Sequence, residues 1–305
     1  MQAADLARGR WPDLLAHFGI ERHLLTGKHT ACPSCGGRDR FRFDDKDGRG
    51  TFYCSHCGSG DGFQLLSMVK GWLFREAAAE VERIAGSIKP GTPKRQQTDA
   101  DKLEACKRIW QESKPVTQGD PVSLYLQRRS IETVPPCIRF HPGLTYRHDD
   151  GAVTRHPAML AKVQAADGSG TAIHRTYISD DGQKADVPTV KKILGSLPPS
   201  SAVRLSEPGS NLGVAEGIET ALCAAVRFGI PVWAAISAGG LERWTPPAGT
   251  ERVVICGDND VSYTGQAAAF SLAKRLIDAG IKVEVKIPEV PGQDWNDVFS
   301  MGGSQ

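Results

Sequence analysis

The sequence contains no uninterrupted apolar run that approaches the roughly 18 residues of a transmembrane helix. Its first residues, Met-Gln-Ala-Ala-Asp-Leu-Ala-Arg, lack the charged-then-apolar layout of a signal peptide. An excess of charge of one sign is also missing, because the formal net charge is only +2 over 305 residues. Global charge therefore does not indicate a polyanionic partner. These absences predict a cytoplasmic protein that does not contact a membrane.

Eight cysteines are present, and in the reducing cytoplasm they are better explained as metal ligands or buried thiols than as disulfides. Four of them form two pairs, Cys32-x2-Cys35 and Cys54-x2-Cys57, with eighteen residues between the pairs. This is the spacing of a four-cysteine zinc ribbon, in which both pairs bind one tetrahedral Zn²⁺. Because protein fills all four positions, the zinc would be structural. The alternative is two redox or incidental pairs that share this spacing by coincidence.

Between the cysteine pairs, basic and aromatic residues alternate. A strand over this segment places Arg40 and Arg42 on one face and Phe41 and Phe43 on the other. We interpret the phenylalanines as the small core of the ribbon. The two arginines are either solvated or bind the phosphates of a single-stranded nucleic acid, and we favour the second interpretation.

Acidic residues follow three apolar segments that have the pattern of strands. Carboxylates at the ends of parallel strands lie in the crevice where open α/β sheets bind ligands. Such carboxylates would repel one another unless a divalent cation neutralised them, and their oxygens suit Mg²⁺ or Mn²⁺. A helix-terminal charge or a polar turn could explain each segment alone, but not their shared edge. The predicted metal ligands are Glu216, Asp258, Asp260, Asp294 and Asp297.

The chain has the organisation of an α/β protein with three parts. Residues 1–88 are predicted to form a zinc-binding domain, a ribbon with accompanying helices, and 89–100 a polar tether rich in proline and glycine. A mixed α+β subdomain is expected over 101–209, beginning with a helix. Over 210–305, strands and helices alternate, which predicts a Rossmann-like parallel sheet covered by helices.

Several segments resemble a known family. VAEGIETALCAA, SAGGLERW, CGDNDVSYTGQAAAFSLAKRL and PGQDWNDVF are similar to the Toprim domain of primases from phages and other mobile elements. Upstream, Ala172–Tyr177, the Asp181-Gly-Gln-Lys segment and Lys191–Gly195 resemble the region that precedes Toprim in those proteins. The ribbon, ending in Cys57-Gly-Ser-Gly-Asp-Gly, resembles their zinc-binding domain. The resemblance covers most of the chain except the tether.

The resemblance implies a DNA primase, which synthesises short RNA primers from ribonucleoside triphosphates on single-stranded DNA during replication of such an element. By position, Asp258 and Asp260 would hold catalytic Mg²⁺ or Mn²⁺, and Asp294 and Asp297 would complete the metal shell. Glu216 would act as general base toward the attacking 3′-hydroxyl, or as a further metal ligand. The middle subdomain would be the N-terminal part of the primase core.

Basic residues that precede the predicted sheet are candidates for binding template and nucleotide phosphates, although each could instead be solvated. They are His174, Arg175, Lys184, Lys191 and Lys192. The Gly-x4-Gly-Lys-Ser/Thr loop of ATP-hydrolysing helicases is missing, so we expect a helicase partner to act from a separate chain. Two other functions are considered: a Toprim-type metal-dependent nuclease, and a non-catalytic module that binds single-stranded DNA during replication.

Overall fold

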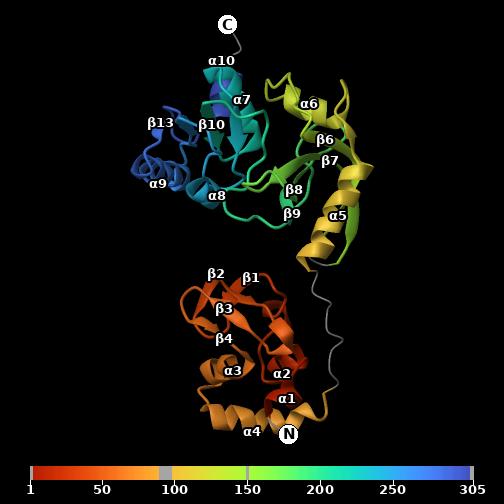
Figure 1. The fold of residues 1–305 in the computed structure, drawn as a ribbon. Helices are drawn as coiled ribbons and strands as arrows, with labels where there is room; N and C mark the ends of the chain where they lie inside the picture. Colours follow the sequence, from red (N-terminus) through yellow and green to blue (C-terminus); the bar gives the residue numbers. More distant parts are fainter. Residues whose placement is uncertain (1–2, 89–97, 149–150, 303–305) are drawn as a thin grey trace. The chain divides into compact units, whose positions relative to one another are not determined.

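The computed structural model describes residues 3–88, 98–148 and 151–302. The chain divides into two compact units, Met1–Gln96 and Gln97–Gln305 (Figure 1). Of the expected tether, residues 89–97 lie outside the described residues. The helix expected from residue 101 begins at Asp99, because the Thr98 side chain accepts a hydrogen bond from the Asp101 backbone N–H and caps it. Among the helices of the described ranges, none is both long and apolar enough to cross a bilayer.

The first unit is a small four-stranded antiparallel sheet packed with four helices around an aromatic core. The Trp11 and Phe63 rings meet edge to face with centroids 4.7 Å apart, and Phe41 stacks on Phe52 at 5.7 Å. The strands lie in sequence order. Elements of this unit are α1 (Ala3–Ala7), α2 (Trp11–His17), β1 (His29–Cys32), β2 (Gly36–Phe43), β3 (Phe52–Cys54), β4 (Gly58–Gly60), α3 (Gly62–Lys70) and α4 (Phe74–Ala85), with short 3-10 turns at Arg22–Leu24 and Lys46–Gly48.

The second unit begins with a five-stranded antiparallel sheet in the order β5-β6-β7-β8-β9. Helix α5 packs on one face through Cys106, Ile109 and Trp110. Helix α6 packs on the other face, where its buried Tyr125 and Leu126 share a core with the following domain. The elements are α5 (Asp99–Glu112), β5 (Lys114–Pro115), α6 (Pro121–Gln127), β6 (Ile138–Arg147), β7 (Val153–Gln164), β8 (Gly170–Tyr177) and β9 (Lys191–Gly195).

The C-terminal part is a parallel four-stranded sheet in the order β11-β10-β12-β13, with helices on both faces. This confirms the predicted α/β class and the parallel sheet. The crossovers place every strand end at one edge of the sheet. The elements are β10 (Asn211–Ala215), α7 (Ile218–Phe228), β11 (Val232–Ala234), α8 (Ala238–Arg243), β12 (Arg252–Cys256), α9 (Thr264–Asp278), β13 (Lys282–Lys286) and α10 (Trp295–Gly302).

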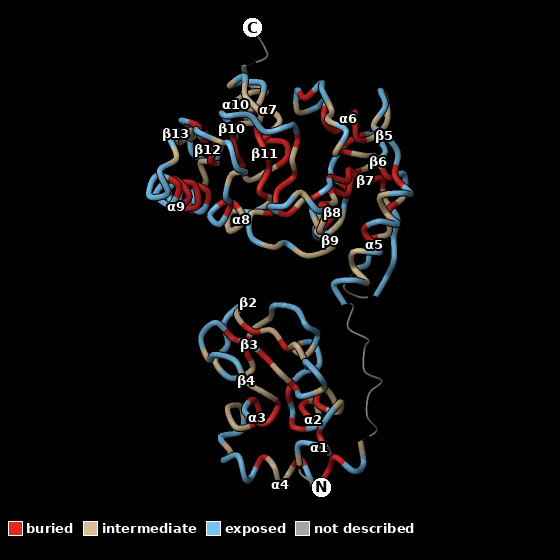
Figure 2. Tube along the Cα trace, viewed as in Figure 1, coloured by how far each residue is buried: buried red, intermediate tan, exposed pale blue. Residues whose placement is uncertain are grey.

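Apolar side chains of the two central strands, β10 and β12, point alternately to the two faces of this sheet and pack against helices on both. On β12, Val253 and Ile255 pack with α8 and α9, whereas Val254 and Cys256 pack with α7 and the core shared with α6. The near-continuous apolar run of β12 follows from burial on both faces. Figure 2 shows β10 and β11 buried between their covering layers. The strand ends are therefore held rigidly where the acidic residues begin.

Candidate functional site

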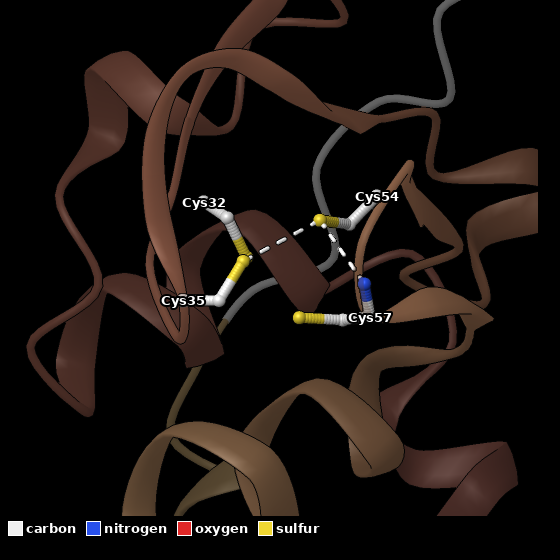
Figure 3. Close-up of side chains that lie close together, drawn as sticks. All are labelled: Cys32, Cys35, Cys54 and Cys57. Atoms are coloured by element: carbon white, nitrogen blue, oxygen red, sulfur yellow. Dashed lines mark hydrogen bonds between the residues drawn. The ribbon is translucent and has the colours of Figure 1, made fainter.

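The four paired cysteines meet in the first unit (Figure 3). Their sulfur atoms all lie within 4.8 Å of one another, and the Cys35 and Cys54 sulfurs are 3.7 Å apart. Tetrahedral coordination with Zn–S bonds near 2.3 Å requires sulfur separations of about 3.8 Å. Cys32 ends β1 and Cys54 ends β3, while Cys35 and Cys57 lie in the turns that follow. The donor set therefore fits a structural Zn²⁺.

After each cysteine pair the chain reverses direction at a glycine. Gly36 and Gly58 follow the two cysteine pairs and have φ of 68° and 87°. This left-handed region is accessible to glycine at little cost. Four thiolates leave no open coordination position, so the site has no place for a substrate.

Of the two candidate arginines on β2, Arg40 and Arg42, the second has a carboxylate partner. Phe41 and Phe43 are buried, as the alternation predicts. Arg42 donates two hydrogen bonds to Asp44, the shorter at 2.7 Å, so a carboxylate already compensates its charge. Arg42 pairs in register with Tyr53, whose side chain is 46% exposed on the same face. That face combines a cation with an accessible aromatic ring, as a strand-binding surface requires.

In the second unit, two strand ends and the start of a helix bring carboxylates to one cavity of about 340 Å³. Glu216 follows β10, Asp258 follows β12, and Asp294 and Asp297 lie at the start of α10. All four line the cavity. Other parts of its wall come from Tyr125, Arg129, His174, Lys184, Lys191 and Glu219.

The electrostatics of the cavity are those of crowded acids. Burial raises the pKa of Asp258 to about 7, and the negative charges of Asp294 and Glu216 add to the rise. Burial also raises the pKa of Glu216, followed by the charge of Asp260. The Asp258 Oδ1 atom is buried and has no hydrogen-bond partner. A buried oxygen without a donor, surrounded by like charges, is an arrangement that a divalent cation would stabilise.

Asp260 is held differently from the other acids and does not line the cavity. Its Oδ2 accepts a 2.8 Å hydrogen bond from the Gly265 N–H in the first turn of α9. A Cβ on Gly265 would lie 2.9 Å from the Asp258 carbonyl oxygen and 3.0 Å from Asp260 Oδ2, so this close approach requires glycine. Asp260 nevertheless acts on Glu216 and Asp258 through its charge.

Asp294 is also fixed by its neighbours. Its Oδ1 accepts hydrogen bonds from the backbone N–H groups of Asn296 at 2.7 Å and Asp297 at 2.9 Å, and its Oδ2 accepts one from the Thr220 hydroxyl at 3.3 Å. Among residues 3–88, 98–148 and 151–302, only the four cysteines gather three or more donors within 4.8 Å. The acidic residues are therefore close enough to raise the pKa of Asp258 and Glu216, but their oxygens are more widely spaced than the cysteine sulfurs. Carboxylate oxygens are the hard donors that suit Mg²⁺, which retains water ligands in protein sites.

One residue that lines the same cavity has a strained backbone conformation. Ile236, which follows β11 and lines the cavity, has φ of 76°. For a β-branched residue this conformation costs on the order of 1–3 kcal/mol and is typical of functional sites. Its N–H donates a 2.8 Å hydrogen bond to the Glu216 carbonyl oxygen, which fixes the chain at the end of β10.

The candidate basic residues separate into two groups across the antiparallel sheet. His174, Lys184 and Lys191 line the carboxylate cavity. Arg175 and Lys192 are direct partners in the β8–β9 register and line a second cavity. Successive side chains of a strand point to opposite faces, which accounts for the separation. The five residues therefore do not form one site.

His174 is buried, with 6% of its surface exposed. Burial lowers its pKa to about 4, so at neutral pH the ring carries no positive charge to offer a phosphate. Lys191 forms an ion pair instead, with its Nζ 2.9 Å from Glu219 Oε2. Its positive charge partly offsets the rise in the pKa of Glu216 and of Asp258.

The second cavity, of about 550 Å³, is strongly basic. It lies on the face of the sheet that carries α5. Five cationic side chains line it, against the single carboxylate of Glu112, whose Oε2 is 3.5 Å from His141 Nε2. Across the described ranges, no ion pair joins any of the five to a carboxylate. The cations are Arg108, Arg147, Arg155, Arg175 and Lys192.

Sequence reasoning missed Glu219 and Tyr125. Glu219 is buried on the first turn of α7 and accepts hydrogen bonds from Tyr125 Oη at 2.7 Å and Lys191 Nζ at 2.9 Å. Burial opposes ionisation, but Lys191 and Tyr125 outweigh it and lower the pKa of Glu219 to about 2. A signal was available, because Glu219 is one turn from buried Cys223 and so lies on an otherwise apolar helix face.

Family models match three parts of the chain. Residues 27–63 match the zinc-binding domain of primase-helicase, and residues 211–305 match the Toprim domain. The chain carries a primase-type zinc ribbon and a Toprim domain. Between these domains, residues 100–205, which include the antiparallel sheet, match a domain of unknown function.

Solved primase structures also show similarity to the chain. A fragment of the Aquifex aeolicus primase, with zinc-binding and RNA polymerase domains, is 16% identical, with 99% of this chain and 83% of that one covered and a TM-score of 0.47. The primase fragment of the bacteriophage T7 primase-helicase protein is 14% identical, with 91% and 99% covered and a TM-score of 0.39. A DnaG primase catalytic domain bound to single-stranded DNA is 13% identical, with 67% and 76% covered and a TM-score of 0.44. At these values the likeness carries no functional argument.

Proposed function

We propose that the chain is a DNA primase that synthesises short RNA primers on single-stranded DNA by Mg²⁺-dependent nucleotidyl transfer, in the replication of a phage, plasmid or other mobile element. The proposal rests mainly on Asp258, a carboxylate with a buried oxygen that has no hydrogen-bond partner. Burial, and then the charges of Asp294 and Glu216, raise its pKa to about 7. The Toprim and primase-type ribbon matches support the same assignment.

The residues around the cavity would have different roles in this reaction. Asp258, Asp260, Asp294 and Asp297 would hold the metal ions, and Glu216 would act either as general base or as a further metal ligand. Mg²⁺ held by these residues would supply the neutralisation of the phosphates, a lower pKa for the attacking hydroxyl and alignment of the attacking and leaving oxygens. The raised pKa of Glu216 makes its carboxylate a better proton acceptor, in keeping with a general base.

Basic residues on both sides of the antiparallel sheet have separate tasks in this proposal. Lys184 and Lys191, which line the carboxylate cavity, would contact the phosphates of the incoming ribonucleoside triphosphate. Arg175 and Lys192, in the second cavity with three further arginines, would contact the backbone of the template. Phosphate contacts of this kind position a strand without reading its sequence.

Arg40 of the ribbon would bind the same template, with Tyr53 as a stacking surface. Arg42 would contribute only after exchanging its contact with Asp44 for a phosphate. A replicative helicase would be the natural partner of such a primase, since primers are needed where a duplex is opened.

The assay is incorporation of labelled ribonucleotides on single-stranded DNA of varied sequence, with Mg²⁺ or Mn²⁺. We expect short RNA products from the wild-type chain and none from Asp258→Ala or Glu216→Ala, with zinc content and folding retained in both variants. Absence of primers from the wild type on every template would refute the proposal.

A parallel reaction with labelled DNA and metal, but without nucleotides, tests for a nuclease that uses the same carboxylates. Degradation that Asp258→Ala abolishes would assign a nuclease instead. Strand binding without either reaction would assign a non-catalytic replication module.

A further inference from the structure

Glu219 is a buried acid that the reaction as proposed does not use. Its side chain is 7% exposed and forms an ion pair with Lys191 across a distance of 2.9 Å, while the Lys191 side chain remains 44% exposed. The partners come from three separate elements, because Tyr125 lies on α6, Lys191 begins β9 and Glu219 lies on α7. A buried charge is retained at a cost, and a role in holding another group would explain it.

Lys191 is the group that Glu219 would hold in position. Its side chain lines the carboxylate cavity, and its charge reaches both Glu216 and Asp258. A free lysine has a flexible four-carbon stem and would sample many orientations in water. Glu219 itself is fixed by the 2.7 Å hydrogen bond from Tyr125 and by burial, so it presents one fixed anchor to the ammonium group.

The ammonium group has three N–H donors, and Glu219 accepts from one of them. The other two donors belong to a side chain that lines the same cavity as the acids that would hold the metal. A cation that lines the same cavity as these carboxylates can contact the phosphates of a nucleotide bound there.

We propose that Glu219 is a positioning residue that holds the Lys191 ammonium against the wall of the carboxylate cavity, ready to contact the phosphates of the incoming nucleotide. This inference rests on the proposed nucleotidyl transfer and adds a residue to it. Glu219 acts through Lys191 and touches neither the nucleotide nor the metal. Tyr125 secures the other carboxylate oxygen.

The test is a cycle of the variants Glu219→Gln, Lys191→Met and the double variant. In Glu219→Gln the amide oxygen can still accept from Tyr125, but the amide N–H₂ then faces the Lys191 ammonium and releases it. We expect the KM for the ribonucleotide to rise about tenfold to a hundredfold, as for loss of a charge-assisted hydrogen bond, with a much smaller change in kcat. Lys191→Met should give a similar KM.

The KM of the double variant shows whether Glu219 acts through Lys191 or contributes independently to nucleotide binding. Because Glu219 acts only through Lys191, adding Glu219→Gln to Lys191→Met should leave KM unchanged within about twofold. Glu251→Gln, at an exposed position immediately before β12 on the opposite sheet edge, is the matched control and should behave as wild type. Thermal unfolding of every variant checks that the fold persists.

Two results would overturn the inference. Multiplied KM effects in the double variant would show that Glu219 acts independently of Lys191. A lowered KM in Glu219→Gln would show that Glu219 competes with the nucleotide for the ammonium. Equilibrium binding of a fluorescent ribonucleoside triphosphate separates this outcome from failure of the proposed function: a chain that binds nucleotide through Lys191 but makes no primer retains the positioning role and loses the primase assignment.

Discussion

Asp258→Asn should stabilise the second unit when Mg²⁺ is absent, although it removes a central residue of the site. Asp258 has its pKa raised from 3.8 to about 7 by burial, then by the charges of Asp294 and Glu216. At 1.36 kcal/mol per pKa unit, the ionised carboxylate destabilises the folded state by at most about 4 kcal/mol. For a unit of this size, asparagine should raise the unfolding temperature by up to about 8–16 °C at pH 8.

The pH dependence has a definite sign. Below pH 3.8 the carboxyl is protonated in both the folded and unfolded chain, so it contributes nothing. As the pH rises toward about 7, the unfolded chain loses this proton and the folded chain keeps it, so the destabilisation grows and reaches its full size above pH 7. The advantage of Asp258→Asn should therefore be largest near pH 8 and shrink toward zero near pH 4.

Calorimetry of the full chain measures this effect. The buffer must be freed of Mg²⁺ by resin rather than by a soluble chelator, so that zinc remains on the cysteines. Added Mg²⁺ should stabilise the wild type and leave Asp258→Asn unchanged. Asp278→Asn is the control, since Asp278 is exposed and forms an ion pair with Lys274 on the surface of α9. A lower unfolding temperature for Asp258→Asn than for wild type at pH 8 would refute the reasoning.

Three further predictions concern other parts of the chain. Cys54→Ser should lose zinc and the unfolding transition of the first unit, measured by metal analysis and calorimetry, because zinc supplies folding energy; retained zinc would contradict this. Tyr125→Phe should lower the free energy of unfolding of the second unit by about 1–3 kcal/mol in urea titration, because Glu219 loses a buried donor; an unchanged midpoint would contradict this. Arg147→Ala with Arg155→Ala should weaken binding of single-stranded DNA and reduce the salt slope by about 0.7 for each phosphate that is no longer neutralised, measured by fluorescence anisotropy; an unchanged slope would exclude binding of phosphates by these two arginines.

The acidic edge was predictable because it depends on local patterns. The apolar runs Asn211–Ala215 and Arg252–Cys256 could only be buried strands, and their alternation with helices required parallel pairing. Their ends then had to share one edge, which places Glu216 near Asp258 without any knowledge of side-chain packing. The cysteine pairs were predictable for the same reason, since two tight turns fix their own geometry.

Other features depended on contacts between distant residues. Glu219 is buried because Tyr125, 94 residues earlier, and Lys191, 28 residues earlier, pack against it, and no local pattern encodes that meeting. The division of Arg175 from His174 follows from simple strand alternation. It was missed because the mixed stretch before the parallel sheet gave no clear strand boundaries. The sequence also did not show that Asp260 lies outside the cavity lining, where its Oδ2 accepts a hydrogen bond from the Gly265 N–H in the first turn of α9.

Counting bound Mn²⁺, from loss of its free-ion electron paramagnetic resonance signal, tests the carboxylate site most directly. The zinc-loaded wild-type chain should bind Mn²⁺, Mg²⁺ should displace it, and Glu216→Gln or Asp258→Asn should lose that binding while keeping zinc. Equal Mn²⁺ binding by wild type and both variants would contradict a metal centre built by these strand ends.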